Sequence, residues 1–411
     1  MQISATLPQP RAFARLAWSN LAAQSAEQIA LAAGALVAVL VLGAGTGGTG
    51  MLQAAQTLPF LLLSIPAGLL ADSVARPRLL AGAEALRAVS LAVILVLSGL
   101  GLLNLPLLAV LGFIGAAGTV VYSVATPALV PALVTRAMLP TANGRIELAR
   151  TTAFAAGPAV GGALVGSIGA NPAFGIAAGL SVVAVVLLAG LREPARATIA
   201  GRRPLHDLRQ GAAFVFRHPL LRPVFITQIV FNTAFFCLQA AYVPYAIHDL
   251  GLDAMGVGLT LAAYGVGLVI GALLAARIVA ALPFGVVVAI GPLSALVASL
   301  LMVVTIAVPS AFLAAFAFLL MGSGPAVWVV STTTLRQVVT PPVLLGRVSA
   351  LSVFSYGARP VGAALAAVVG SAYGAAPCLV LAAAGFAVQA VIICRSPVVR
   401  LARLPALVDQ P

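Results

Sequence analysis

Residues 48–99 read GTGMLQAAQTLPFLLLSIPAGLLADSVARPRLLAGAEALRAVSLAVILVLSG. Two long apolar runs, 48–70 and 78–99, are joined by a short loop that carries Asp72 and Arg76, and Arg78 begins the second run. A helix of about 20 apolar residues crosses the hydrocarbon core of a bilayer, which is about 30 Å thick. This stretch therefore predicts two transmembrane helices connected by a charged loop at the membrane surface.

The rest of the chain repeats this pattern. Of its 411 residues, 62% are hydrophobic and only 8% are charged, and the mean hydropathy is +1.14. A soluble domain carries about 25% charged residues, and disorder requires low hydrophobicity, so both classes are excluded. The composition predicts an all-α polytopic membrane protein. Apolar windows predict twelve transmembrane spans, at roughly 17–42, 48–70, 78–99, 104–130, 146–168, 172–191, 221–247, 255–277, 284–306, 309–333, 348–370 and 375–394.

One long polar segment, Arg192 to His218, divides the spans into six and six. We therefore predict an N-terminal six-helix bundle at 1–191, a cytoplasmic linker at 192–220 and a C-terminal bundle with a short tail at 221–411. The halves also repeat: Phe154-Ala-Ala-Gly-Pro-Ala-Val-Gly-Gly-Ala-Leu in span 5 is similar to Tyr356-Gly-Ala-Arg-Pro-Val-Gly-Ala-Ala-Leu in span 11. Two fused bundles of this kind place a substrate site at the membrane midplane between them.

The basic residues predict the orientation. All 22 are Arg, and the alternate loops at 43–47, 100–103, 169–171, 248–254, 307–308 and 371–374 contain none. Cytoplasmic loops carry the excess of positive charge, which predicts that both termini and the central segment are cytoplasmic. This placement accounts for the net charge of +13 without a nucleic-acid partner. The heavy use of Ala, Gly and Arg, with no Lys, suggests a GC-rich bacterial genome, so we expect the protein in a bacterial plasma membrane.

The loop after the second span, from Gly68 to Leu80, resembles the cytoplasmic signature of the major facilitator superfamily, G-x-L-A-D-R-x-G-R-R-x-x-L. The residues that match are Gly68, Leu70, Ala71, Asp72, Arg76 and Leu80, whereas Ser73, Ala75 and Pro77 depart and make the loop less basic. The resemblance implies that Asp72 helps to hold the two halves together near Arg76. The alternative is a solvated loop carboxylate.

A second motif lies in span 5. Gly157-Pro158-Ala-Val-Gly161-Gly162 resembles the G-P-x-x-G-G core of the superfamily's antiporter motif, with Ala153 where a glycine is expected. Glycines allow close approach between membrane helices, and Pro158 permits a bend. The resemblance implies that this segment shapes an export pathway. The alternative is ordinary tight helix packing.

Two further stretches narrow the resemblance. Residues 205–222 and 335–362 are similar to the bacterial branch that contains the enterobactin exporter and macrolide-efflux proteins, and the similarity covers nearly the whole chain. It implies a twelve-helix secondary transporter with two pseudo-symmetric bundles.

Charged residues within the spans are the sharpest candidates for function, because such residues are costly in a membrane. Glu27 lies about 15 Å into span 1, with Asn20 and Gln24 at helical spacing on the same polar face. Arg359 lies about 17 Å into span 11. Burial favours the protonated form of a carboxyl group, and a neighbouring Arg favours the ionised form. We therefore predict that Glu27 couples proton movement or binds a substrate cation, and the alternative is a permanent Glu27–Arg359 ion pair.

Two other acid–base pairs are spaced i, i+3, which allows each pair to meet on one helix face. Glu84 and Arg87 lie in span 3, which is peripheral in the superfamily, so a structural role is favoured. Glu147 and Arg150 lead into the glycine–proline motif, where structural and gating roles are equally expected.

Span 7, the counterpart of span 1, predicts part of a substrate cavity. Asn232, Phe236 and Gln239 share one face, and aromatic and amide groups suit a mostly apolar pocket with a few orienting polar groups. Trp328 in span 10 is a weaker candidate for the same cavity. Helix packing is the alternative for all four.

The sequence argues against an enzyme. It contains no Walker A motif, no histidine spacing typical of a metal site and no pattern that implies a cofactor. We predict a monomeric secondary transporter in the lipid bilayer that exports a small amphipathic compound, such as a drug or secreted metabolite, in exchange for protons. The alternatives are a proton-coupled importer on the same scaffold and a non-transporting sensor or lipid-handling protein.

Overall fold

The computed structural model describes residues 10–135, 138–191 and 204–405, and in these residues the chain is helical with no strand. The helices follow one another as α1(Pro10–Leu40), α2(Thr46–Leu62), α3(Ser64–Ser73), α4(Arg76–Gly99), α5(Leu105–Leu133), α6(Leu139–Ile168), α7(Ala170–Ala189), α8(Pro204–Arg217), α9(Leu221–His248), α10(Ala254–Ala281), α11(Phe284–Ala307), α12(Ala311–Val339), α13(Pro342–Phe354), η2(Ser355–Ala358), α14(Arg359–Tyr373), α15(Ala375–Cys394) and η3(Pro397–Arg400). The prediction of an all-α polytopic membrane protein is confirmed.

Two of the twelve predicted spans are not single straight helices. In the described part of the chain, ten helices are long and apolar enough to cross a membrane, and α2 with α3 forms an eleventh span bent by 48°. Pro66 near the start of α3 has no N–H to donate to Leu62, which accounts for the bend. The span predicted at 348–370 is divided among α13, η2 and α14. There Pro360 cannot donate to Tyr356, and the Arg359 N–H bonds to the Tyr356 carbonyl in a tighter 3₁₀ turn instead.

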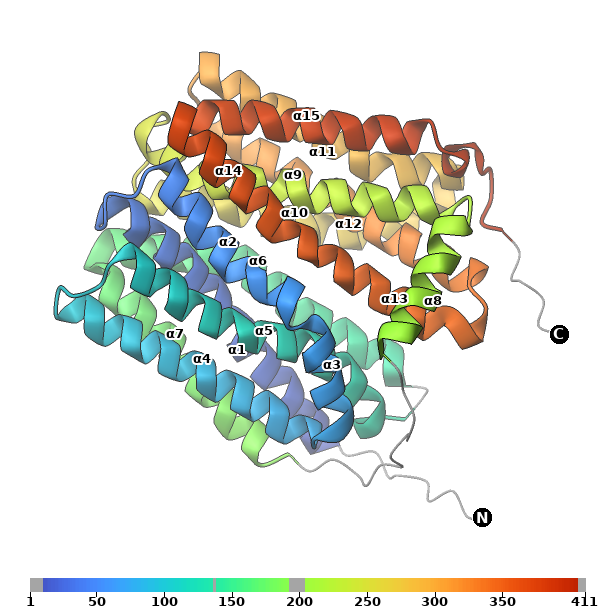
Figure 1. The fold of residues 1–411 in the computed structure, drawn as a ribbon, viewed down its shortest axis with the longest axis horizontal. Coiled ribbons are helices and arrows are strands. Elements are labelled where there is room, and N and C mark those ends of the chain that lie inside the picture. Colours follow the sequence, from blue (N-terminus) through green and yellow to red (C-terminus); the bar gives the residue numbers. More distant parts are fainter. Residues whose placement is uncertain (1–9, 136–137, 192–203, 406–411) are drawn as a thin grey trace.

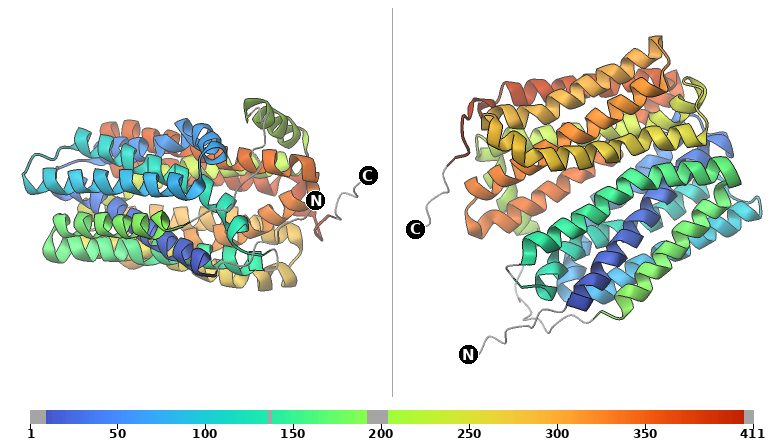
Figure 2. Two further views of the ribbon diagram at one scale, coloured as in Figure 1. Left: turned by 90° about the horizontal axis from the view of Figure 1, so that it is seen from below. Right: turned by 180° about the vertical axis from the view of Figure 1, so that it is seen from behind.

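The helices pack as two groups that lie side by side (Figure 1, Figure 2). We call α1–α7 the N half, in which α1 contacts α6 and α7 while α4 contacts α5 and α7. We call α9–α15 the C half, in which α12 lies between α10 and α11 while α15 contacts α9 and α11. The amphipathic helix α8 contacts α13 and α9 and runs across the direction of the spans. The start of α1 and the end of α15 lie at the same end of the molecule, here called the terminal end, and the opposite end is called the far end (Figure 1).

Short turns with local capping connect the helices at the far end. Asp253 accepts a hydrogen bond from the Gly256 N–H at 2.7 Å and so begins α10. Gly169 and Gly374 have φ of 88° and 82°, and each is at once the last cap of one helix and the first cap of the next. A side chain would be strained at that positive φ. These equivalent glycines therefore turn α6 into α7 and α14 into α15.

The two halves touch along two seams that are built on small residues. In the seam between α2 and α14, a Cβ added to Gly50 would lie 2.5 Å from the Ala367 backbone nitrogen. In the seam between α6 and α10, a Cβ added to Gly162 would lie 2.4 Å from the Ala254 carbonyl oxygen. The buried Thr49 hydroxyl also donates across the halves to the Ala240 carbonyl at 2.8 Å. These contacts hold the halves together at the far end.

At the terminal end, the turn between α8 and α9 depends on a neutral histidine. The Nδ1 atom of His218 accepts from the backbone N–H groups of Leu220 and Leu221, at 3.2 and 3.3 Å. Burial lowers the pKa of His218 below its ordinary value of about 6.5. Protonation would turn this acceptor into a donor, so the turn loses stability as the pH falls below the ordinary pKa of histidine.

We therefore expect the amide protons of residues 212–222 to exchange faster at about pH 5.5 than at about pH 7.5, a range that brackets the ordinary pKa of His218. The rates are measured by hydrogen–deuterium exchange and are corrected for the pH dependence of exchange in an unfolded chain. His218→Asn supplies a cap that does not titrate, and its corrected rates should not change with pH. An equal pH response in the variant would contradict this role.

Candidate functional site

A buried charge cluster joins three helices of the N half. Arg87 on α4 donates to Glu84 at 2.7 Å and forms a longer ion pair with Glu27 on α1, at 3.7 Å. Glu84 is 0% exposed, Arg87 4% and Glu27 17%. The cluster therefore holds two carboxylates and one guanidinium inside the membrane-spanning region, where unpaired charge is costly.

The remaining donors of Arg87 fix it in place. One nitrogen donates to the Ala23 carbonyl at 3.2 Å, and another donates to the Thr119 hydroxyl of α5. The hydrogen bonds of Arg87 are therefore made to Glu84, Ala23 and Thr119, and none is made to Glu27. The buried Oε2 atom of Glu27, in contrast, accepts no hydrogen bond from the described residues.

A second cluster surrounds Arg359 at the junction of the halves. Residues i and i+3 eclipse in a 3₁₀ turn, which places the Arg359 guanidinium 4.1 Å from the centre of the Tyr356 ring. It also lies 4.8 Å from the Phe60 ring of α2 and 5.1 Å from the Phe236 ring of α9. Its Nε atom donates to Asn232 Oδ1 at 3.2 Å. Three rings and one amide thus surround a cation that pairs with no carboxylate of the described residues.

The predicted alternative of a Glu27–Arg359 ion pair is not what the structure shows. Glu27 pairs with Arg87 in its own half, and the contacts of Arg359 are with the rings and Asn232. Glu27 and Arg359 therefore belong to different clusters, one in each half, without direct contact.

The other residues predicted to line the cavity divide into two sets. Asn232 and Phe236 belong to the Arg359 cluster, and Gln239 has a buried Oε1 atom that accepts no hydrogen bond from the described residues. Asn20 is different, because it is buried and donates to the Ile146 carbonyl of α6 at 3.2 Å. Asn20 therefore joins α1 to α6.

Trp328 is placed away from the Arg359 cluster. It is buried in an apolar core with Phe225, Phe284 and Leu335, and the α11 backbone approaches it closely at Gly291. The Trp328 ring therefore packs between helices. The sequence alone does not distinguish such packing from the lining of a cavity. Gln24 on α1 is half-buried.

The two i, i+3 pairs occupy opposite environments. Glu84 and Arg87 are enclosed, as described above. Arg150 instead forms a two-pronged contact with Glu147 while both side chains remain open, at 40% and 54% exposed. The Arg150 guanidinium also lies 5.4 Å from the Phe154 ring. An open ion pair of this kind contributes little to stability.

The glycine–proline motif positions α6 between two neighbours. A Cβ added to Gly157 would lie 2.3 Å from the Gln28 Cβ, and one added to Gly161 would lie 3.0 Å from the Ala32 Cβ, both on α1. On the opposite side, Gly162 meets α10 of the other half, and the Pro158 carbonyl lies 2.5 Å from a Cβ added to Gly258. The motif therefore serves close packing both within the N half and across the halves.

The loop motif is described in part. Gly68 lies within α3, and Arg76 at the start of α4 donates to the Ala128 carbonyl of α5 at 2.5 Å. The Asp72 side chain lies outside the described part of the structure. The motif thus connects α4 to the end of α5.

Two partners of Arg359, Phe60 and Tyr356, were not predicted. They carry no signal of their own within apolar runs, although the i, i+3 spacing of Tyr356 and Arg359 could have suggested a contact. The glycines of α10 at the seam between the halves were not predicted either, and two of them, Gly258 and Gly265, are seven residues apart. That spacing places small residues on one helix face.

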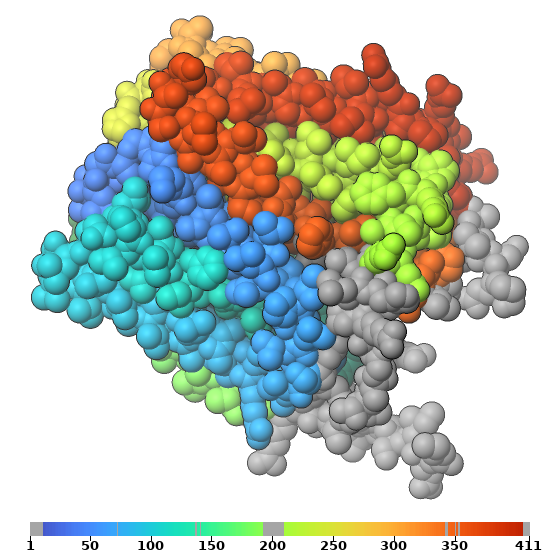
Figure 3. Space-filling model, viewed as in Figure 1, coloured from blue at the N-terminus to red at the C-terminus, as the bar shows by residue number. Residues whose placement is uncertain are grey.

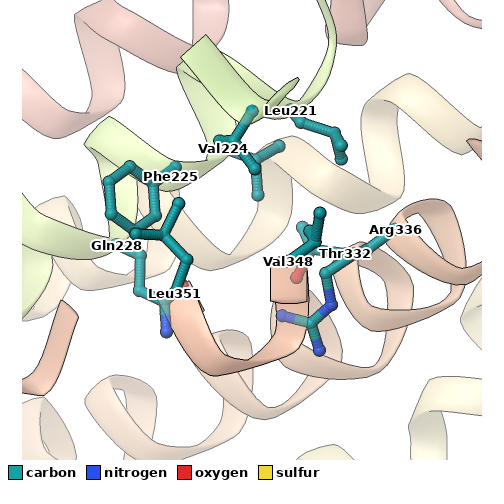
Figure 4. Close-up of a pocket in the computed structure, with 9 residues that line it drawn as sticks. Leu221, Val224, Phe225, Gln228, Thr332, Arg336, Val348 and Leu351 are labelled. Carbon is teal, nitrogen blue, oxygen red and sulfur yellow. The ribbon is translucent and has the colours of Figure 1, made fainter. Parts of the chain in front are cut away.

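A small cavity in the C half is too small for an organic substrate. It lies between α8, α9, α12 and α13 and has a volume of about 30 Å³. Figure 4 shows Phe225 and Arg336 on opposite sides of it. A space of this size holds about one water molecule.

Comparison with known proteins agrees with this architecture. The family model for transmembrane secretion effectors matches residues 8–406. The chain is 27% identical over 205 residues to the multidrug efflux pump Tap of Mycolicibacterium fortuitum, and this match covers 47% of the chain and half the length of that pump.

Solved structures share the fold at low sequence identity. A bacterial homologue of the iron transporter ferroportin in an inward-facing state has a TM-score of 0.74 at 16% identity, covering 95% of this chain and 99% of that one. A POT family transporter in complex with a thioalcohol-conjugated peptide has a TM-score of 0.75 at 13% identity, covering 96% and 99%. The fold is that of the major facilitator superfamily, and the chain is a multi-pass membrane transporter that belongs to its transmembrane secretion effector family.

Proposed function

We propose that this transporter exports a small amphipathic organic compound in exchange for protons, by alternating access between two bundles. The bundles comprise residues 1–191 and 221–411, joined by a linker at 192–220. The observation that carries the proposal is that each half holds a charged residue within its spans, Glu27 on α1 and Arg359 on α14, with separate partners. The efflux pump named above supports the export direction by similarity alone.

Glu27 is the proposed proton site. Arg87 lies 2.7 Å from Glu84 but 3.7 Å from Glu27. Its positive charge therefore stabilises Glu84 more strongly than Glu27. Glu27 is also the more exposed of the two acids. The charged groups that face it are Arg87 and Glu84 of its own half and, at longer range, Arg359. A proton arriving through the space between the halves therefore meets Glu27 first.

The proposed orientation follows from the arginines. Positive charge favours the cytoplasmic side, which assigns both termini to the cytoplasm of a bacterial cell and the far end to the outside. The cross-half contacts run from the far end to the middle of the helices, so this state is proposed to be open toward the cytoplasm. Because both bundles belong to one chain, we propose that a monomer is sufficient for transport.

The test is intracellular accumulation of a panel of dyes and antibiotics in an efflux-deficient bacterium that expresses the chain. We expect lower accumulation with the wild type, and loss of that effect with a protonophore or with Glu27→Gln. Asp249→Asn is the control, because it removes an exposed acid from the loop between α9 and α10 and should keep activity. Higher accumulation with the wild type would indicate uptake, and an active Glu27→Gln variant would overturn the proposed coupling.

A further inference from the structure

An apolar cleft opens beside the Arg359 cluster. It lies between α2, α8, α9 and the α13–η2–α14 segment, and its volume is about 620 Å³. That volume is typical of sites for small organic molecules. Figure 3 shows the face on which α2 and α3 (blue), α14 (orange) and α8 (yellow-green) meet.

The cleft faces the side of the molecule that a bilayer would cover. Large apolar residues on its walls are exposed, namely Leu61, Phe216, Phe354 and Val361. Figure 1 views the spans from the side, and α8 crosses them near the terminal end. Exposed apolar walls on the side of a membrane helix bundle are in contact with lipid rather than water, so the cleft opens toward one leaflet.

The inner wall of the cleft is shared with the Arg359 cluster. Leu61, Thr233 and Ala358 line the cleft, and each is next in sequence to a residue of the cluster, namely Phe60, Asn232 and Arg359. The wall is thin at one point, because the Leu61 side chain lies against Gly357, 2.8 Å from where a Cβ would be. Both elements that meet here are interrupted. The helix α2 ends at the bend to α3, and the span predicted at 348–370 is interrupted by η2.

The charged residues at the cleft and behind its inner wall are both arginines. Arg209 on α8 lines the cleft and is exposed, and Arg359 lies behind the inner wall. The described lining residues include no Asp or Glu. An apolar passage with a cation at each end complements a molecule with an apolar body and an anionic group.

We infer that this cleft is a lateral entrance through which an anionic amphiphile dissolved in the membrane leaflet reaches Arg359. The inference rests on the proposed function and deepens it by naming the charge and the route of the substrate. The apolar body lies along Leu61, Phe225 and Ile229, and Arg209 attracts the anionic group at the surface. Movement of the Leu61 side chain away from Gly357 then admits the group to Arg359.

The test uses photolabelling of the full chain in liposomes, with a stearic acid that carries a diazirine on its acyl chain. Its uncharged methyl ester is the comparison probe. Labelling of residues 225–233 and 354–361 is mapped by mass spectrometry and divided by labelling around lipid-exposed Val368. We expect the acid to label the cleft about threefold more than the ester, as for one partly exposed charge contact.

Three variants make the result specific. Ile229→Trp fills the cleft and should lower its labelling, whereas Val304→Trp, on an exposed surface of α11, should not. Arg209→Gln should remove the preference for the acid over the ester. Equal labelling by acid and ester in the wild type, or labelling unchanged by Ile229→Trp, would overturn the inference. Labelling requires no proton gradient, so a failure of proton coupling at Glu27 would be seen separately in the accumulation assay.

Discussion

Replacing Arg87 by Leu is expected to lower the free energy of unfolding by about 3–5 kcal/mol. The substitution leaves Glu84, which is 0% exposed, without its 2.7 Å partner and removes the only cation paired with Glu27 among the described residues. Removing one member of a buried ion pair leaves an uncompensated charge in a place where water cannot solvate it. Thermal unfolding of the purified protein in detergent measures the effect as a fall in Tm.

Two further variants separate this cause from general damage. Arg150→Leu is the matched control, because Arg150 and Glu147 are also an i, i+3 pair but are 40% and 54% exposed, and exposed pairs contribute at most about 1 kcal/mol. Adding Glu84→Leu to Arg87→Leu should recover part of the lost stability, since the buried acid is then gone. Equal losses for Arg87→Leu and Arg150→Leu would contradict the account of the cluster.

Replacing Gly162 by Val is expected to prevent closure of the far end. Its Cβ would lie 2.4 Å from the Ala254 carbonyl oxygen and 2.8 Å from the Gly258 Cα, and both are backbone atoms that cannot rotate away. An overpacking cost of about 3 kcal/mol shifts an equilibrium between two states more than about 100-fold. Substrate export should therefore be abolished, because the cycle needs both states.

The shift is measured by the rate at which a membrane-impermeant maleimide labels Ala240→Cys, which is buried beside the Thr49 contact, in a background without the three native cysteines. Labelling should be faster in Gly162→Val. Gly166→Val is the control one turn away, where a Cβ meets only ordinary contacts of 3.5 Å or more. If both variants behave like the parent, the α6–α10 seam does not hold the far end closed.

Hydropathy predicted the fold because burial in lipid demands long apolar helices, and ten helices coincide with single predicted spans. It could not predict the interruptions near Pro66 and Pro360. A proline inside an apolar run hardly changes the hydropathy, yet it removes one backbone hydrogen bond and allows a bend. The bend in α2 and the 3₁₀ turn at η2 were therefore visible only in the structure.

The sequence predicted which residues belong to the candidate site, but it did not predict all of the residues that they contact. The cost of charge in a membrane singled out Glu27 and Arg359, because charged residues are rare in spans, whereas Arg87 was predicted only as the partner of Glu84. Helical spacing reports contacts within one helix, and the Glu27–Arg87 pair joins α1 to α4. The rotation of one helix against another depends on packing, so this pair was not predicted. Phe60, one of the rings around Arg359, was not predicted for the same reason.

The central claim is that the two halves alternate under the control of a proton on Glu27. It is tested by spin-label distances across the halves, at Leu102–Val308 near the far end and Ser73–Leu282 near the terminal end, all exposed positions. We predict that a change of pH moves the two distances in opposite directions. Glu27→Gln, which mimics the protonated acid, should show the low-pH distances at every pH. The claim would be contradicted if the two distances did not change with pH, or if they changed with pH in Glu27→Gln as they do in the wild type.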